Sequence, residues 1–101
     1  MAPAMDPLAQ AFQRFAAALE AQDVAAYHAM SVEDAAPQDE LFLRNARRLK
    51  DKGLSLRLRR AVQEEDAAEV AFDVVDADGK AVDSGKVTFT RESDGWRIRT
   101  L

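Results

Sequence analysis

The sequence has 101 residues, of which 48% are hydrophobic and 32% are charged, with a formal net charge of −4. This length suits one domain that buries about 65% of its unfolded surface, and the composition excludes a disordered chain. The negative charge argues against general affinity for nucleic acid, and the lack of cysteine excludes disulfides and thiolate chemistry. The sequence shows no leader-like N-terminus and no apolar run of about 18 residues, so we expect a soluble, cytoplasmic protein.

A long amphipathic helix is predicted near the start of the chain. Asp6 followed by Pro7 favours a helix start, because the carboxylate can cap the helix and proline fits its first turn. Apolar residues then recur at spacings of four, three and four, which predicts one buried stripe of Leu8, Phe12, Phe15 and Leu19. We expect residues 1–6 to be a disordered N-terminus and residues 7–101 to form a single domain.

Two further helices are predicted before the middle of the chain. Asp23 can cap a short helix that runs to about Met30, and the acidic stretch 31–37 is typical of a connector. A third helix is expected over about 38–52, where Gly53 follows in the usual position past a helix C-terminus. Acidic residues at its start and basic residues at its end suit the helix dipole.

The second half of the sequence predicts four antiparallel strands, because apolar and polar residues alternate there with a period of two. The strands are expected at 54–63, 67–75, 81–90 and 96–101. The face predicted to be buried consists of Leu54, Leu56, Leu58, Val62, Val70, Phe72, Val74, Val87, Phe89, Trp96 and Ile98. The expected fold class is therefore α+β, with N-terminal helices packed on a curved four-stranded antiparallel meander sheet.

The third predicted strand has an irregular apolar pattern. Val82 falls on an even position, whereas Val87 and Phe89 fall on odd positions. A β-bulge near Ser84 and Gly85 would let all three face inward and would bend the sheet. We therefore expect Gly85 at a bulge or at a positive φ.

Several segments share a pattern with one known superfamily. They are the helix with Phe12, Phe15 and Leu19, the segment 23–30, and the strand segments 85–89 and 95–98. Together they resemble the nuclear-transport-factor-two-like (cystatin-like cone) superfamily, which includes ketosteroid isomerases and polyketide cyclase-like proteins. The resemblance implies a curved sheet wrapped around the N-terminal helix. The early pair of strands usual in that family does not fit into 31–37, so we expect a pared-down cone.

Enzymes of the resembled family need an ionisable group inside the cone, and no predicted inward residue of the sheet transfers a proton at neutral pH. The helices offer Tyr27 and His28 as candidates, although a lone histidine beside an apolar face is more often a surface residue. One histidine and no cysteine leave no metal-ligand cluster, and no glycine-rich phosphate loop or nucleophile elbow occurs. We expect no catalytic residue, no metal and no cofactor, and leave enzymatic activity as the least favoured interpretation.

Three surfaces or pockets are candidates for binding. A shallow pocket between the first helix and the sheet would hold a small apolar ligand; its candidate residues are Phe12, Phe15, Tyr27, His28, Phe72, Phe89 and Trp96. Eight of the 14 basic residues lie within 44–60, which predicts either a charge-guarded edge or a docking site for an acidic protein at Arg44, Arg47, Arg48 and Lys52. The outer face of the sheet is the third candidate, as a homodimer interface of Arg57, Arg59, Ala71, Asp73, Thr88, Thr90, Arg97 and Arg99.

The favoured interpretation is a small non-catalytic interaction domain that is homodimeric through this outer face. Its arginines would pair with Glu69, Asp73 or Asp83 of the second copy. A ligand binder with the pocket described above, and an enzyme of ketosteroid isomerase or polyketide cyclase-like type, remain as alternatives. No nucleic acid and no membrane is expected as a partner.

Overall fold

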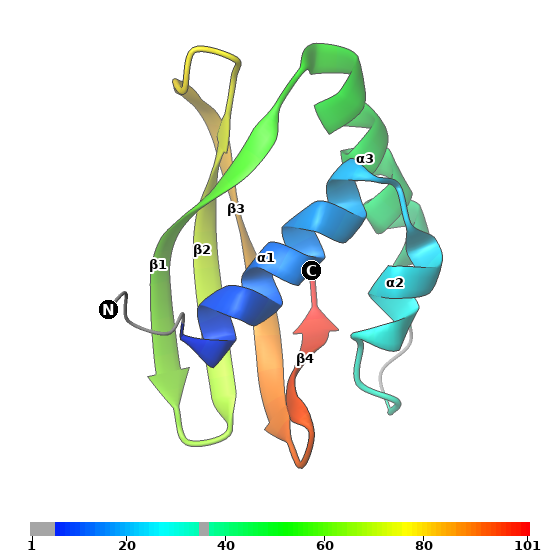
Figure 1. The fold of residues 1–101 in the computed structure, drawn as a ribbon, viewed down its shortest axis with the longest axis vertical. Helices are drawn as coiled ribbons and strands as arrows, with labels where there is room; N and C mark the ends of the chain where they lie inside the picture. Colours follow the sequence, from blue (N-terminus) through cyan, green and yellow to red (C-terminus); the bar gives the residue numbers. More distant parts are fainter. Residues whose placement is uncertain (1–5, 35–36) are drawn as a thin grey trace, which may run out of the picture.

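The computed structural model describes residues 6–34 and 37–101, which form three helices followed by four strands. The elements are α1 (Pro7–Glu20), α2 (Val24–Ala29), α3 (Asp39–Lys52), β1 (Ser55–Glu64), β2 (Ala67–Val75), β3 (Ala81–Glu92) and β4 (Gly95–Thr100). The strands pair antiparallel in the order β1-β2-β3-β4. Figure 1 shows α1 lying across one face of the sheet, with α2 and α3 beside it past β4. The predicted α+β architecture is confirmed.

The helix ends follow the predicted capping residues. The Asp6 carboxylate accepts a hydrogen bond of 2.8 Å from the Leu8 N–H, and the Asp23 carboxylate accepts one of 3.0 Å from the Ala26 N–H. Gly53 ends α3 in the left-handed conformation, with φ 63°. Asp6 is thus the N-cap of α1, and the other residues of the expected disordered N-terminus lie outside the described residues.

The apolar stripe of α1 is the centre of the core. Leu8, Phe12, Phe15 and Leu19 are each at most 3% exposed, and they face the inner side of the sheet. The sheet contributes Val70, Val74, Val87, Phe89, Trp96 and Ile98 to this core. Burying a side chain of this size stabilises the fold by roughly 1.5–3 kcal/mol, so the packing of α1 on the sheet is a large part of what holds the fold together. None of the described helices is long and apolar enough to cross a membrane.

Strand β1 leaves the predicted alternation halfway along its length. Leu58 pairs with Phe72 and Arg60 pairs with Ala71, so Arg59 is an extra residue on β1. This bulge reverses the faces beyond it, and Val62 pairs with Glu69 on the outer face. The prediction that Val62 faces the core is therefore wrong, and Val62 is 40% exposed.

The bulge in β3 lies at Val82 and not at Gly85. Val74 pairs with Asp83 and Val75 with Ala81, which leaves Val82 unpaired and 49% exposed. Gly85 pairs in register with Phe72, and its φ is not positive, so the predicted bulge there is wrong. Glycine is needed at this position for space, because a Cβ would lie 2.7 Å from the Phe72 ring atom Cζ.

The outer edge of β4 is covered by the segment that follows α2. The Ile98 N–H donates to the Met30 carbonyl at 2.8 Å, and the Val32 N–H donates to the Ile98 carbonyl at 2.9 Å. Ser31 and Ile98 form a parallel bridge as a result. Part of the predicted connector thus protects the outer edge of β4.

Candidate functional site

A cavity of about 290 Å³ lies between α1, α3 and the sheet. We call it the cone cavity. It lies at the end of the sheet where β3 begins, and its walls come from all three layers. The residues that line it are Phe15, Leu19, Asn45, Arg48, Leu49, Leu56, Phe72, Val74, Asp83, Ser84, Gly85, Lys86 and Leu101.

The inner wall of the cone cavity is apolar. Phe15, Leu19 and Leu49 are buried side chains of the two helices, and Phe72 reaches the cavity from β2. The Phe72 ring packs against Phe12, with 5.8 Å between ring centroids. Because Gly85 has no side chain, this ring lies directly against the Gly85 backbone, where a Cβ would be 2.7 Å from Phe72 Cζ.

The mouth of the cone cavity is polar. Arg48 Nη1 on α3 lies 2.6 Å from Asp83 Oδ2 on β3, and the Ser84 N–H donates to Asp83 Oδ1 at 2.8 Å. The hydrogen bond from Arg48, followed by that from Ser84, holds the pKa of Asp83 below its usual value. Asp83 is therefore ionised at neutral pH and is a weak base, which suits ligand contact better than proton abstraction.

The structure divides the predicted ligand residues into two groups. Phe15 and Phe72 line the cone cavity, whereas Phe12, Phe89 and Trp96 are buried in the core away from it. The two remaining candidates lie on α2. Tyr27 stacks on Phe42 with 4.6 Å between centroids, and its hydroxyl accepts a hydrogen bond from the Gln38 N–H. His28 is at the surface, where its Nε2 lies 2.6 Å from Asp39 Oδ1.

The polar residues of the mouth were not among the predicted ligand residues. Asn45 lies three residues before Arg48 and four before Leu49, and residues at these spacings are neighbours on a helix surface. That spacing indicates a shared direction on α3. The partner Asp83 has no comparable signal, because its position depends on the bulge at Val82.

On the outer face of the sheet, most predicted interface residues have partners within the chain. Arg57 and Arg59 both lie near the Asp73 carboxylate, at 3.5 and 3.4 Å, and the Asp73 side chain is only 16% exposed. Thr88 bonds to Thr100, and the Arg99 Nε donates to the Thr90 hydroxyl at 2.7 Å. Arg97 pairs with Asp94, and Ala71 is 9% exposed between its longer neighbours. The acids that were expected to pair with a second copy also have partners within the chain. Glu69 pairs with Lys86, Asp73 with Arg57 and Arg59, and Asp83 with Arg48.

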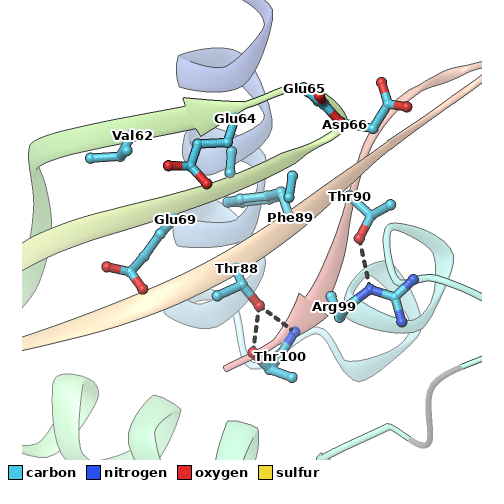
Figure 2. Close-up of a pocket in the computed structure, with 12 residues that line it drawn as sticks. Val62, Glu64, Glu65, Asp66, Glu69, Thr88, Phe89, Thr90, Arg99 and Thr100 are labelled. Carbon is cyan, nitrogen blue, oxygen red and sulfur yellow. Dashed lines mark hydrogen bonds between the residues drawn. The ribbon is translucent and has the colours of Figure 1, made fainter.

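An open groove of about 860 Å³ runs over one end of this outer face (Figure 2). Carboxylates border it on the β1–β2 side, namely Glu64, Glu65, Asp66 and Glu69. Thr88, Thr90, Arg99 and Thr100 border it on the β3–β4 side. The opposite end of the face, toward the start of β1, carries Arg57 and Arg59, so the outer face is polarised along the strands.

The predicted docking site for an acidic partner lies on α3. Arg44, Arg47 and Lys52 make no ion pair with any other described residue, while Arg48 is held by Asp83. An acidic partner at this helix stays a prediction. Within the ranges 6–34 and 37–101, no group of three His, Cys, Asp or Glu side chains is arranged to hold a metal ion.

No protein-family model matches the sequence, and no curated protein matches it. Solved structures do share its fold. A proposed NTF2-like transpeptidase from Campylobacter jejuni is 15% identical, with a TM-score of 0.69 over 93% of this chain and 97% of that chain. A proposed isomerase of the SnoaL-like family from Agrobacterium tumefaciens is 13% identical, with a TM-score of 0.65 over 94% and 93%.

A third structure, a proposed ketosteroid isomerase from Shewanella frigidimarina, is 17% identical, with a TM-score of 0.63 over 93% and 91%. These likenesses cover nearly the whole of each chain, while the identities are too low to carry an activity across. They agree with the curved sheet and the N-terminal helix described above. The chain has the nuclear-transport-factor-two-like fold.

Proposed function

We propose that this chain is a non-catalytic binding domain that holds a small, mainly apolar molecule in the cone cavity. The observation that carries the proposal is the volume of about 290 Å³ enclosed by Phe15, Leu19, Leu49 and Phe72. Small-molecule sites typically start at about 300 Å³ and combine apolar walls with a few polar groups. The Arg48–Asp83 pair and Asn45 supply those polar groups at the mouth.

Toluene is a suitable probe, because it tests the apolar walls alone. Its titration into labelled protein is expected to shift the amide NMR signals of Leu49 and Gly85 in a saturable manner. The variant Leu56→Trp places an indole in the cavity and is expected to abolish these shifts.

The variant Leu58→Trp is the matched control. Leu58 lies two residues further along the same strand, is 38% exposed, and does not line the cavity. It is expected to bind toluene as the unmodified chain does. Unsaturable shifts in the unmodified protein, or equal binding by both variants, would contradict a ligand site in the cone cavity.

A homodimer through the outer face of the sheet is the second candidate, and it is compatible with a ligand site on the inner face. It is supported by the opposite charges at the two ends of that face, with Arg57 and Arg59 at one end and Glu64 and Glu69 at the other. A two-fold axis near Ala71 places each basic end against the acidic end of the second copy. The arginines then bridge two chains in addition to the carboxylates they already contact.

The dimer is tested by sedimentation at micromolar concentration. Thr88→Glu adds a charge next to Glu69, with which Thr88 pairs, and Arg57→Glu removes a cation from the basic end; both are expected to weaken the dimer. Arg44→Glu changes the same charge on α3 and is expected to leave it intact. A clean monomer of 11.2 kDa for the unmodified chain would reject this candidate.

A further inference from the structure

Every charged side chain that lines the cone cavity already has a partner of opposite charge. Arg48 contacts Asp83 at 2.6 Å, and Lys86 Nζ lies 3.4 Å from Glu69 Oε1. The side chains of the other lining residues are uncharged. The cavity therefore offers no unpaired cation, among the described residues, to neutralise the charge of an anionic ligand.

Asp83 makes the mouth unfavourable for a ligand anion. Its pKa is held below the usual value by Arg48 and by the Ser84 N–H, so it carries its charge throughout the neutral range. A ligand carboxylate that approaches the Arg48 guanidinium meets the Asp83 carboxylate at the same group, and the two anions repel each other. An uncharged amide or hydroxyl avoids this repulsion.

The same mouth has spare hydrogen-bonding capacity for a neutral polar group. A guanidinium has five N–H donors and a carboxylate has about four acceptor sites, and the Arg48–Asp83 contact uses one of each. A second acceptor site of the Asp83 carboxylate is used by the hydrogen bond from the Ser84 N–H. The Asn45 side chain, which makes no hydrogen bond within the described residues, adds an amide that both donates and accepts.

We propose that the cone cavity prefers neutral ligands that carry an amide or hydroxyl group on an apolar ring or chain, and that the Arg48–Asp83 pair disfavours carboxylates. This inference rests on the proposed ligand-binding function. A volume of about 290 Å³ corresponds to roughly ten non-hydrogen atoms at about 30 Å³ each, so a single substituted ring fills it.

Benzamide and benzoate test the selection, because they have the same shape and differ in charge. Each is titrated into the labelled chain at neutral pH while the amide signals of Leu49 and Gly85 are followed by NMR. Benzamide is expected to bind about threefold to fivefold more tightly, a ratio set by the modest strength of exposed charge interactions. Asp83→Asn removes the repelling charge and keeps an acceptor for the Ser84 N–H, so it is expected to equalise the two affinities or favour benzoate.

Two further variants make the outcome decisive. Asp66→Asn is the matched control, because it removes an exposed carboxylate that lies 3.2 Å from Arg91, outside the cavity. This variant should keep the preference for benzamide. Arg48→Gln leaves Asp83 without its partner and should weaken benzoate binding further.

Equal or tighter binding of benzoate by the unmodified chain, or an unchanged preference in Asp83→Asn, overturns the proposed ligand selection but leaves the proposed ligand site intact. Saturable binding of neither toluene nor benzamide overturns both.

Discussion

The two ends of the core between α1 and the sheet differ in how completely they are filled. At the end near α2, Phe89, Trp96 and Ile98 occupy the space under the helix and are at most 8% exposed. At the end near the start of β3, Gly85 takes the place of a side chain and leaves Phe72 beside a cavity. The same alternation of apolar and polar residues thus gives a sheet with one tightly packed end and one end that borders a cavity.

The difference shows how such a small domain can combine stability with a pocket. The filled end is reinforced by the segment 30–32, which pairs with Ile98, and by Arg91, whose guanidinium lies 5.3 Å from the Trp96 ring centroid. At the open end the Arg48–Asp83 pair joins α3 to β3, and both of its side chains are about 45% exposed. An exposed pair of this kind contributes little stability, so the open end depends on the filled end for its shape.

The largest expected effect comes from emptying the filled end. Trp96→Ala removes a side chain that is 8% exposed and packs under α1, and it is expected to destabilise the fold by about 3–5 kcal/mol. Chemical denaturation monitored by circular dichroism measures this loss. A midpoint that hardly moves would place Trp96 outside the core and remove the contrast between the two ends.

A smaller effect on stability is expected from filling the open end. In Gly85→Ala the new Cβ lies 2.7 Å from Phe72 Cζ, so the ring has to move into the cavity. A displaced rotamer costs about 0.5–1.5 kcal/mol, and replacing glycine in a strand recovers about 0.5–1 kcal/mol, so the net change stays within about 1 kcal/mol.

Ligand binding is expected to respond more strongly to this substitution. Toluene affinity should fall about tenfold, which corresponds to about 1.4 kcal/mol of lost contact. Toluene titration and denaturation of the same sample separate the two effects. Unchanged toluene binding in a folded Gly85→Ala chain would show that the ring does not border the ligand site.

The smallest effect is expected at the surface of the filled end. Arg97 donates to the carbonyl of Ala29 at 2.9 Å and is held by Asp94, whose pKa is lowered chiefly by its hydrogen bond with Arg97. A lowered pKa in the folded state adds stability that is present above the usual value of 3.8 and is lost as the pH falls below it. Asp94→Asn should therefore be slightly less stable at pH 7 and should lose less stability between pH 7 and pH 3.

Thermal unfolding at the two pH values measures this difference. Asp78→Asn, in the turn between β2 and β3, is the control, because the Asp78 side chain makes no ion pair within the described residues. Equal acid sensitivity of Asp94→Asn and the unmodified chain would mean that the Asp94–Arg97 pair does not help to hold segment 30–32 on β4.

Periodicity and capping residues predicted the helices, the strands and most of the core. The positions of the strand bulges depend on tertiary contacts; the bulge expected in the third strand was placed near Gly85, and those in β1 and β4 were not predicted. The stripe of α1, the caps at Asp6 and Asp23 and the buried positions Phe89 and Trp96 are set by local spacing. The bulges lie at Arg59, Val82 and Arg99, and each is fixed by pairing with a neighbouring strand.

The cavity could be predicted only in part for the same reason. Phe15 was predicted from the apolar stripe of the first helix and Phe72 from strand alternation, but neither pattern distinguishes them from Phe12, which is buried in the core. The open space depends on the missing side chain of Gly85 opposite Phe72. The pairing of Arg48 with Asp83 joins residues 35 positions apart, and a single sequence carries no signal for it.

A crystal structure of the protein under xenon pressure tests the central claim most directly. Xenon binds in apolar cavities, so an open cone cavity predicts a xenon atom between Leu19, Leu49 and Phe72. The same experiment on Gly85→Ala predicts that this site is lost, because the Phe72 ring moves into it. A cavity filled by its own side chains, with no xenon in the unmodified protein, would contradict the account.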